Sequence, residues 1–392
     1  MPLARSSAIV SAATATAAML AFVACNAATD GGTLDGDPGA GAGAGNPGSG
    51  YGGNDGGGLG QVQDGGLPDG ALVVGDGAPS SNDASVDGEA VDGTVPPAGT
   101  WSSGASGTGV ASGAFETWRG TKVTVAGTWN DGDWSSSEGQ PTLSSEYAGW
   151  QGDIDDTLGA FWNGSWSQAA AGAYDTNWRT AVKNMAKARA GKSGNFYVRL
   201  AHEMNGDWYE WKVDSSNVAD FKTAWARFAG IVRAEFPAAK IVFGASNGTN
   251  GDIGVPAMWP GDQYVDVVGV DFYDMWPNLP DQAAWDAEFM GTDHGDSPRG
   301  IGAWLAFAKA HKKPLSVPEW GLNWANDGSS GPQDNPFFIQ KMNEFFRANA
   351  GTGPGQILYE VYYNIDDVKA QLYPVASNPN GSAKYKSLAW GK

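Results

Sequence analysis

Residues 218–246 read VADFKTAWARFAGIVRAEFPAAKIVFGAS and contain a helix pattern followed by a strand pattern. The first part places apolar side chains at the 3.6-residue spacing of one helix face, namely at Phe221, Trp225, Phe228, Ile231 and Val232. This spacing predicts a helix over Val218–Phe236, and Pro237 marks its exit. Ile241–Phe243 is then apolar on consecutive positions, as in a strand buried on both faces. The stretch therefore predicts one helix–strand unit of an α/β fold.

The same alternation continues in both directions along the chain. The predicted strands are Val110–Gly113, Lys122–Gly127, Thr157–Trp162, Asn195–His202, Lys240–Ser246, Val265–Tyr273, Pro314–Glu319 and Gln356–Tyr363. The further predicted helices are Asn177–Ala190, Ile301–His311 and Pro336–Ala348. Eight such units in about 290 residues predict a (β/α)8 TIM barrel. A doubly wound open sheet is the alternative, but Gly251–Gly254 does not open a convincing helix and so lacks the phosphate-binding pattern.

The first hundred residues have a different composition from the rest. Residues 26–100 hold 23 of the 58 glycines and one aromatic residue, whereas all 18 tryptophans lie from Trp101 to Trp390. A segment with so few apolar side chains cannot offset the entropy cost of folding. We therefore expect three parts: a signal peptide over 1–25, a disordered Gly/Asp-rich tether over 26–100, and one catalytic domain over 101–392.

The extreme N-terminus has the pattern of an export signal. Arg5 precedes an apolar, Ala-rich run from Ala8 to Ala24, which is too short for a convincing membrane span. The run ends at Cys25, and this boundary resembles a bacterial lipoprotein cleavage box. We expect an outer-membrane or cell-surface lipoprotein with its lipid anchor at Cys25, or otherwise a secreted protein. Membrane fractionation of a Cys25→Ala variant tests the anchor, because retention of that variant would contradict it.

Charge and cysteine content narrow the ligand classes. The formal net charge of −19 argues against nucleic acid and anionic membrane surfaces and favours a neutral ligand. The single cysteine excludes an intramolecular disulfide, and His202, His294 and His311 lack zinc-ligand spacing. We expect no cofactor and no structural zinc, and we expect the protein to act as a monomer. The composition leaves a carboxylate-bound calcium ion open as an alternative.

Two glutamates are the strongest candidates for catalysis. In a TIM barrel the active site lies at the carboxyl ends of the strands. Glu203 follows the fourth predicted strand and Glu319 ends the seventh, so their carboxylates would face each other across the mouth. Two facing carboxyl groups are what glycoside hydrolysis requires, one as acid and one as nucleophile or base. Several of the 18 tryptophans lie near strand ends, where an indole can pack on the apolar face of a sugar.

The segment RLAHEMNGDWYEW over residues 199–211 resembles the acid/base segment of glycoside hydrolase family 26, the β-mannanase family. Val265–Tyr273 is similar to the sixth strand of that family, and Pro318–Gly321 resembles its nucleophile strand. Two features depart from the family pattern. The seventh strand carries Pro318 and Trp320 in place of the commoner residues, and the eighth ends Val361–Asp366 without the expected tryptophan.

The resemblance implies that Glu203 is the general acid/base and Glu319 the nucleophile. It also implies that Tyr273 donates to Glu319, that Arg199 holds the charge of Glu319, and that Trp208 and Trp211 stack on sugars. The substrate-binding residues expected on this basis are His202, Arg199, Asn205, Trp208, Trp211, Tyr273 and Trp324.

The expected function is a retaining endo-β-glycanase that hydrolyses a β-linked polysaccharide, with β-1,4-mannan as the first candidate. A β-1,3-xylanase and a mixed-linkage β-glucanase are the alternatives within the same family. The alternative from another class is a non-catalytic surface glycan-binding lipoprotein. An enzyme acting on the cell's own exopolysaccharide would have the same sequence features.

Overall fold

The computed structural model describes residues 99–323, 333–366 and 369–391. The expected signal peptide with Cys25, all but the last two residues of the expected tether, and the candidate Trp324 lie outside the described residues.

Eight parallel strands close into a barrel in the order β1-β10-β9-β6-β5-β4-β3-β2. The predicted (β/α)8 TIM barrel is therefore confirmed, and the open sheet is excluded. The strands are β1 (Ser102–Gly107), β2 (Val125–Trp129), β3 (Asp153–Leu158), β4 (Phe196–Leu200), β5 (Lys240–Ser246), β6 (Val267–Asp274), β9 (Leu315–Leu322) and β10 (Ile357–Asn364).

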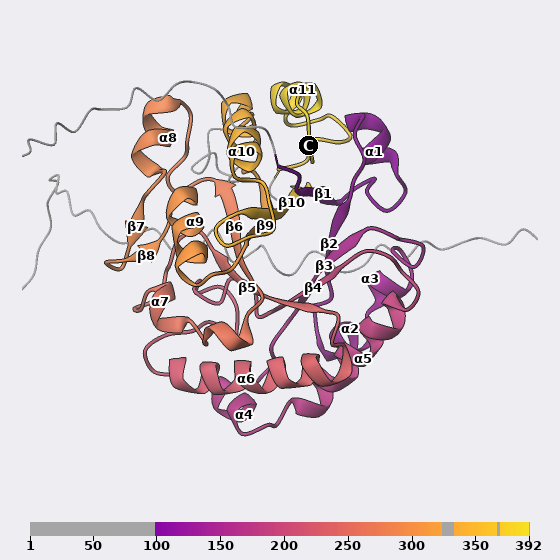
Figure 1. The fold of residues 1–392 in the computed structure, drawn as a ribbon, viewed down its shortest axis with the longest axis vertical. Coiled ribbons are helices and arrows are strands. Elements are labelled where there is room, and N and C mark those ends of the chain that lie inside the picture. The colour runs from indigo at the N-terminus through magenta and orange to yellow at the C-terminus, as the bar shows by residue number, and fades with distance from the viewer. Residues whose placement is uncertain (1–98, 324–332, 367–368, 392) are drawn as a thin grey trace, which may run out of the picture. The chain divides into compact units, whose positions relative to one another are not determined.

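Helices lie outside the strands, as Figure 1 shows for α5, α6, α9 and α10. These four are the predicted helices, and their ends agree with prediction to within two residues: α5 (Asp175–Arg189), α6 (Val218–Glu235), α9 (Ile301–Ala310) and α10 (Pro336–Asn349). The other helices are α1 (Ala114–Arg119), α2 (Trp134–Gly139), α3 (Pro141–Ser144), α4 (Trp166–Ala170), α7 (Val255–Met258), α8 (Gln282–Glu288), α11 (Pro379–Ser387) and a 3-10 turn, Asp262–Tyr264. A short antiparallel hairpin joins β7 (Thr292–Asp293) to β8 (Ser297–Pro298). Among the described residues no helix combines the length and the apolar character that crossing a membrane requires.

The prediction of the first strand was wrong. Residues 110–113 form the turn before α1, and the first barrel strand is β1 with the sequence SSGASG. This strand is made of small residues because its neighbours approach closely: a Cβ on Gly104 would lie 1.7 Å from the Val125 carbonyl oxygen. Small residues give no hydrophobic strand pattern, so the sequence did not indicate it.

The predictions of the second and third strands were displaced along the chain. β2 begins and ends two to three residues after the prediction Lys122–Gly127, and β3 lies four residues before the prediction Thr157–Trp162. The sequence of β3 is DIDDTL, and all six residues are buried. Its carboxylates find partners inside the fold, so a strand that looks too polar for a core is fully packed.

The inside of the barrel is built in layers. The lowest is apolar and consists of Val125, Tyr197, Val242, Val267, Tyr359 and Val361. Two residues further along β4, Arg199 lies above this layer with no exposed surface. Room for its side chain comes from Gly244 on β5, where an added Cβ would lie 2.9 Å from the Arg199 Cδ. The mouth of the barrel lies above this charged layer.

Strand β9 contains one extra residue next to Glu319. Ser316 and Glu319 lie opposite Gly269 and Asp271 of β6, so three steps along β9 match two steps along β6, and the register on β10 shifts in the same place. Strand side chains alternate between faces, and Val317 points into the outer core. Without the extra residue, Glu319 would also point outward. Pro318, which has no N–H to donate to a ladder, lies at this bulge.

We predict that Gly244→Ala lowers the free energy of unfolding by about 1–3 kcal/mol, because the new methyl group overpacks the buried Arg199. The matched control is Gly230→Ala in α6, where nothing lies within 4 Å of the added Cβ. That change should stabilise the helix by about 0.5–1 kcal/mol. Denaturant unfolding of both variants is the measurement. Equal effects of the two changes would contradict close packing at Gly244.

Candidate active site

The end of β4 turns sharply and presents Glu203 to the mouth of the barrel. The Ala201 N–H donates to the Leu158 carbonyl at 2.8 Å, and the Glu203 N–H donates to the Gly244 carbonyl at 2.9 Å. Ala201 and Glu203 both have positive φ angles, 53° and 52°. Residues other than glycine rarely adopt this conformation, and such strain concentrates at functional sites.

Glu203 is buried, and its surroundings favour the protonated carboxyl group. Burial raises the pKa of Glu203 to about 8, and the nearby charge of Glu319 contributes to this rise. The Trp208 indole N–H donates to Glu203 Oε2 at 3.0 Å and opposes the shift. At neutral pH this carboxyl group therefore holds a proton.

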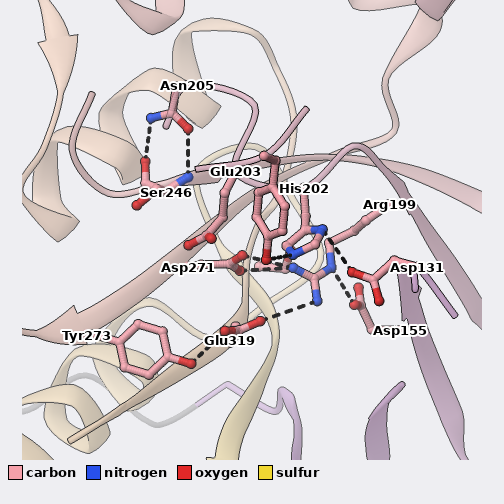
Figure 2. Close-up of polar contacts among 12 residues, drawn as sticks. Asp131, Asp155, Arg199, His202, Glu203, Asn205, Ser246, Asp271, Tyr273 and Glu319 are labelled. Atoms are coloured by element: carbon pink, nitrogen blue, oxygen red, sulfur yellow. Dashed lines mark hydrogen bonds and ion pairs between the residues drawn. The ribbon is translucent and has the colours of Figure 1, made fainter. Parts of the chain in front are cut away.

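Glu319 lies in a different environment, although Figure 2 shows the two side chains entering the same space from different strands. The Tyr273 hydroxyl donates to Glu319 Oε1 at 2.6 Å, and the Arg199 guanidinium lies 3.9 Å from Glu319 Oε2. Burial, together with the Glu319 charge, raises the pKa of Tyr273 well above its usual value, so the phenol stays a neutral donor. A donor and a cation on one carboxylate favour its ionised form.

Arg199 is held by two aspartates inside the barrel. Its Nε donates to Asp155 Oδ1 at 2.7 Å, and one terminal nitrogen contacts both carboxylate oxygens of Asp271 at 3.0 and 3.1 Å. Tyr359 also donates to Asp155. Burial alone would lower the pKa of Arg199, but Asp155, Asp271 and Glu319 together raise it well above its usual value. The cation is therefore permanent.

Burial raises the pKa of both Asp155 and Asp271, and Arg199 opposes this rise in each. The ionised state of these two aspartates therefore depends on the guanidinium between them.

His202 is fixed beside Glu203 as a neutral imidazole. Burial lowers the pKa of His202 well below its usual value, and the Arg199 charge adds to this effect. Its Nε2 lies 2.8 Å from the Tyr209 hydroxyl, and its Nδ1 lies 3.8 Å from Asp131 Oδ2. The Trp211 indole donates to the His202 carbonyl at 2.9 Å. Burial raises the pKa of Asp131 to about 6.

Two expected substrate-binding residues have structural contacts instead. The Asn205 amide donates to the carbonyls of Ser246 and Gly248 and accepts from the Ser246 N–H, all at 2.9 Å. Asn205 is fully buried and ties the loop after β4 to the loop after β5, apart from the two glutamates in Figure 2. Trp211 is also buried and stacks on Tyr209 with ring centroids 4.5 Å apart. It supports His202 and has little surface left for a sugar.

The mouth also contains an aromatic group made of Trp129, one of the tryptophans near predicted strand ends, and Tyr363, which the sequence did not single out. Trp129 at the end of β2 meets Tyr363 of β10 edge to face at 5.5 Å, and Tyr363 meets Tyr273 at 6.0 Å. Trp129 is the last residue of β2, and Tyr363 is the last residue but one of β10, so the carboxyl ends of these two strands bring the rings together.

Asp155, Asp131 and Tyr209 were not predicted as site residues. Asp155 was missed because the third strand was placed too late in the chain, and Asp131 because the second was placed too early. Within the described parts of the chain, no group of three or more His, Cys, Asp or Glu side chains is arranged to hold a metal ion.

Comparison with known proteins gives a family match for one part of the chain. Residues 195–289, which run from the residue before β4 to the residue after α8, match the family model for glycosyl hydrolase family 26. This part of the chain is similar to glycosyl hydrolase family 26. It includes Arg199, His202, Glu203, Asp271 and Tyr273, while Glu319 lies beyond the matched residues.

A curated protein similar to this chain is a mannan endo-1,4-β-mannosidase from Bifidobacterium adolescentis. The two sequences are 24% identical over 241 residues, which cover 52% of this chain. The chain spans only 23% of the length of that relative.

Solved structures share the fold of the described barrel. The catalytic domain of a family 26 endo-β-1,4-mannanase from a Bacillus species superimposes with a TM-score of 0.51 at 12% identity, covering 74% of this chain and 87% of the other. A modular endo-β-1,4-mannanase from Cellulomonas fimi gives a TM-score of 0.52 at 14% identity, covering 74% and 71%. A family 26 protein from a Muricauda species gives 0.51 at 14% identity, covering 74% and 85%. At these identities the likeness concerns the fold.

We predict that Arg199→Met destabilises the protein by about 3–5 kcal/mol, because it leaves two buried aspartates without their cation. The pKa of each orphaned carboxyl should rise further, so the penalty should grow as pH rises and shrink as pH falls and the groups protonate. The measurement is urea unfolding at acidic and alkaline pH.

Arg233→Met is the control for that prediction. Arg233 pairs with Asp266 at the surface, where removing an ion pair costs about 1 kcal/mol or less. A loss at Arg199 that is equally small, or that does not vary with pH, would contradict the buried-charge assignment.

Proposed function

We propose that the protein is a retaining glycoside hydrolase that cleaves a β-linked polysaccharide with Glu203 as acid/base and Glu319 as nucleophile. The observation that carries the proposal is the contrast between the two glutamates. Both are buried, but the pKa of Glu203 is raised to about 8, whereas Glu319 is bound by Tyr273 and faces Arg199. Environments that push two carboxyl groups apart in pKa define an acid and a base.

In the first step the Glu319 carboxylate attacks the anomeric carbon of the sugar. The bond to the glycosidic oxygen breaks, and Glu203 transfers its proton to that oxygen, so the leaving chain departs as an alcohol. The product is a covalent ester between the sugar and Glu319. Tyr273 orients the carboxylate for attack through its hydrogen bond.

In the second step water releases the sugar. Esterification removes the charge of Glu319, and this charge is one cause of the raised pKa of Glu203. The pKa of Glu203 therefore falls, so Glu203, which gave up its proton in the first step, stays ionised and accepts a proton from the attacking water. The water oxygen bonds to the anomeric carbon, the ester breaks, and both glutamates return to their starting states. Two inversions at one carbon retain its configuration.

A neutral polysaccharide fits the charge and the aromatic character of the site. The protein is strongly acidic, Trp208 donates to Glu203, and the Trp129 ring lies 5.9 Å from the Arg199 guanidinium. Indole rings pack on the apolar faces of sugars, and the hydroxyl groups take hydrogen bonds from the polar rim. We propose β-1,4-mannan as the substrate, because the curated relative and two of the solved structures are mannan-cleaving enzymes by name.

Hydrolysis of a polysaccharide panel with sizing of the products tests the substrate. Cleavage of mannan into short fragments from the start supports an endo-mannanase, whereas preference for β-1,3-xylan or mixed-linkage β-glucan assigns one of the family alternatives. Binding without cleavage of any member would contradict catalysis and favour the glycan-binding alternative.

We predict different defects for the two glutamate variants. Glu203→Ala should slow substrates with poor leaving groups most, since good ones need no proton, and azide should rescue it to a β-glycosyl azide. Glu319→Ala should be inactive on all leaving groups, and azide should give at best the α-product. The measurement is the rate and product on aryl glycosides and polysaccharide.

Glu210→Ala is the control for the glutamate variants, because Glu210 lies exposed on the same segment. It should keep its rates on both kinds of substrate. Equal loss on activated and unactivated substrates in Glu203→Ala, with no azide effect, would exclude Glu203 as the acid/base.

We predict that kcat/KM falls as pH rises through about 8, because Glu203 must carry a proton to act as acid. Trp208→Phe removes a hydrogen bond that favours the ionised carboxyl group, so the pKa of Glu203 should rise and the alkaline limb should move to higher pH. Trp259→Phe removes a similar indole–carboxylate bond to Asp262, outside the site, and should leave the profile unchanged. A shift toward lower pH in Trp208→Phe would refute the assignment.

A further inference from the structure

An exposed tryptophan stands on the loop that follows β6. Trp276 keeps 55% of its surface exposed, whereas Trp304, Trp320 and most other large apolar side chains among the described residues are buried. The carboxyl end of β6 is also the end at which Tyr273 reaches Glu319. A large apolar ring left open beside a catalytic mouth is a candidate binding surface.

The base of this loop is fixed. Asp274 is fully buried, and its Oδ1 accepts from the Leu279 N–H at 2.8 Å. The Asn335 side chain at the start of α10 donates to Asp274 Oδ2 at 2.7 Å and to the Leu279 carbonyl at 3.0 Å. The two ends of the loop are therefore tied to each other and to a helix, and the exposed ring stands on a short, anchored turn.

The conformation of the turn keeps the indole outside. The Met275 N–H donates back to the Tyr273 carbonyl at 2.9 Å, and Met275 packs against the cluster that contains Tyr273 and Tyr363. Trp276 follows with φ of 32°, in the left-handed region that bulky residues rarely adopt. Strain of this kind persists where the surrounding structure imposes it, most often at binding and catalytic sites.

Trp276 lies close along the chain to Tyr273, a residue of the proposed catalytic centre. Trp276 lies three positions after Tyr273, so their Cα atoms lie within about 11 Å of each other. Tyr273 itself contacts Glu319. A polysaccharide chain that leaves the catalytic centre on the side of β6 would therefore come within reach of this loop.

We propose that Trp276 is a platform for an additional sugar unit of the polysaccharide, beyond the two units that flank Glu203 and Glu319. This inference rests on the proposed function. The apolar C–H face of a neutral pyranose packs on the indole, and the anchored base of the loop presents the ring without a further entropy cost of ordering it. The platform lengthens the cleft and favours long chains over short glycosides.

The test compares Trp276→Ala with the wild-type full-length chain on a soluble β-mannan and on an activated aryl β-mannoside. Loss of one stacking contact should raise KM for the polysaccharide about three- to tenfold. The kcat/KM for the aryl substrate, which is too short to reach the loop, should not change. Affinity electrophoresis in gels that contain the same β-mannan measures binding independently of catalysis, and Trp276→Ala should be retarded less.

Two controls sharpen the result. Trp276→Phe keeps an aromatic face and should restore most of the binding, and Met290→Ala removes another exposed apolar side chain and should change nothing. Equal losses on both substrates, or unchanged retardation of Trp276→Ala, would overturn the platform. A wild-type protein that is retarded but hydrolyses neither substrate would refute the proposed hydrolase, while the comparison of retardation would still decide the role of Trp276.

Discussion

The site depends on one buried cation. The guanidinium of Arg199 lies inside the barrel, where an unpaired charge is very costly, so Asp155 and Asp271 are required as its partners. Gly244 leaves the space that the side chain needs. The remaining face of the guanidinium is directed at Glu319. Such a cluster adds little net stability compared with an apolar core, but it fixes a positive charge at one point below the mouth.

The proposed division of labour between the two glutamates follows from this arrangement. Glu319 lies next to the cation and the Tyr273 hydroxyl, whereas Glu203 comes from a strained turn with an indole N–H as its hydrogen-bond donor. Each carboxyl group also affects the other, since the charge on Glu319 helps to hold the proton on Glu203. His202 is neutral and oriented by Tyr209, so it adds a polar group without adding charge. The proposed chemistry thus uses two carboxyl groups, and it depends on the charges and hydrogen-bond donors that surround each of them.

The sequence predicted the parts of this structure that follow regular patterns. The helix at 218–236 and the apolar strand at 267–270 have the spacing of their structures, and the segment 199–211 carries most of the candidate site on a single stretch. The misplaced strands have the opposite character. DIDDTL looks too polar for a barrel strand because its acids have partners on other strands, and SSGASG has no side chains large enough to make a pattern. The role of Asp155 depends on its hydrogen bond with Arg199. This contact joins distant positions of the chain, so no local sequence pattern contains it.

The bulge in β9 has a consequence for how this protein can change. A strand has a reading frame of two, in which every odd position belongs to one face and every even position to the other. The extra residue at Pro318 shifts this alternation by one position. Val317 before it therefore points into the outer core, and Glu319 after it points into the barrel. Point substitutions at Pro318 preserve the frame, whereas insertion or deletion of one residue reverses it. The number of residues in this strand is therefore under stricter constraint than their identities, and a transplant of the site into another barrel must carry Ser316–Trp320 as an indivisible unit.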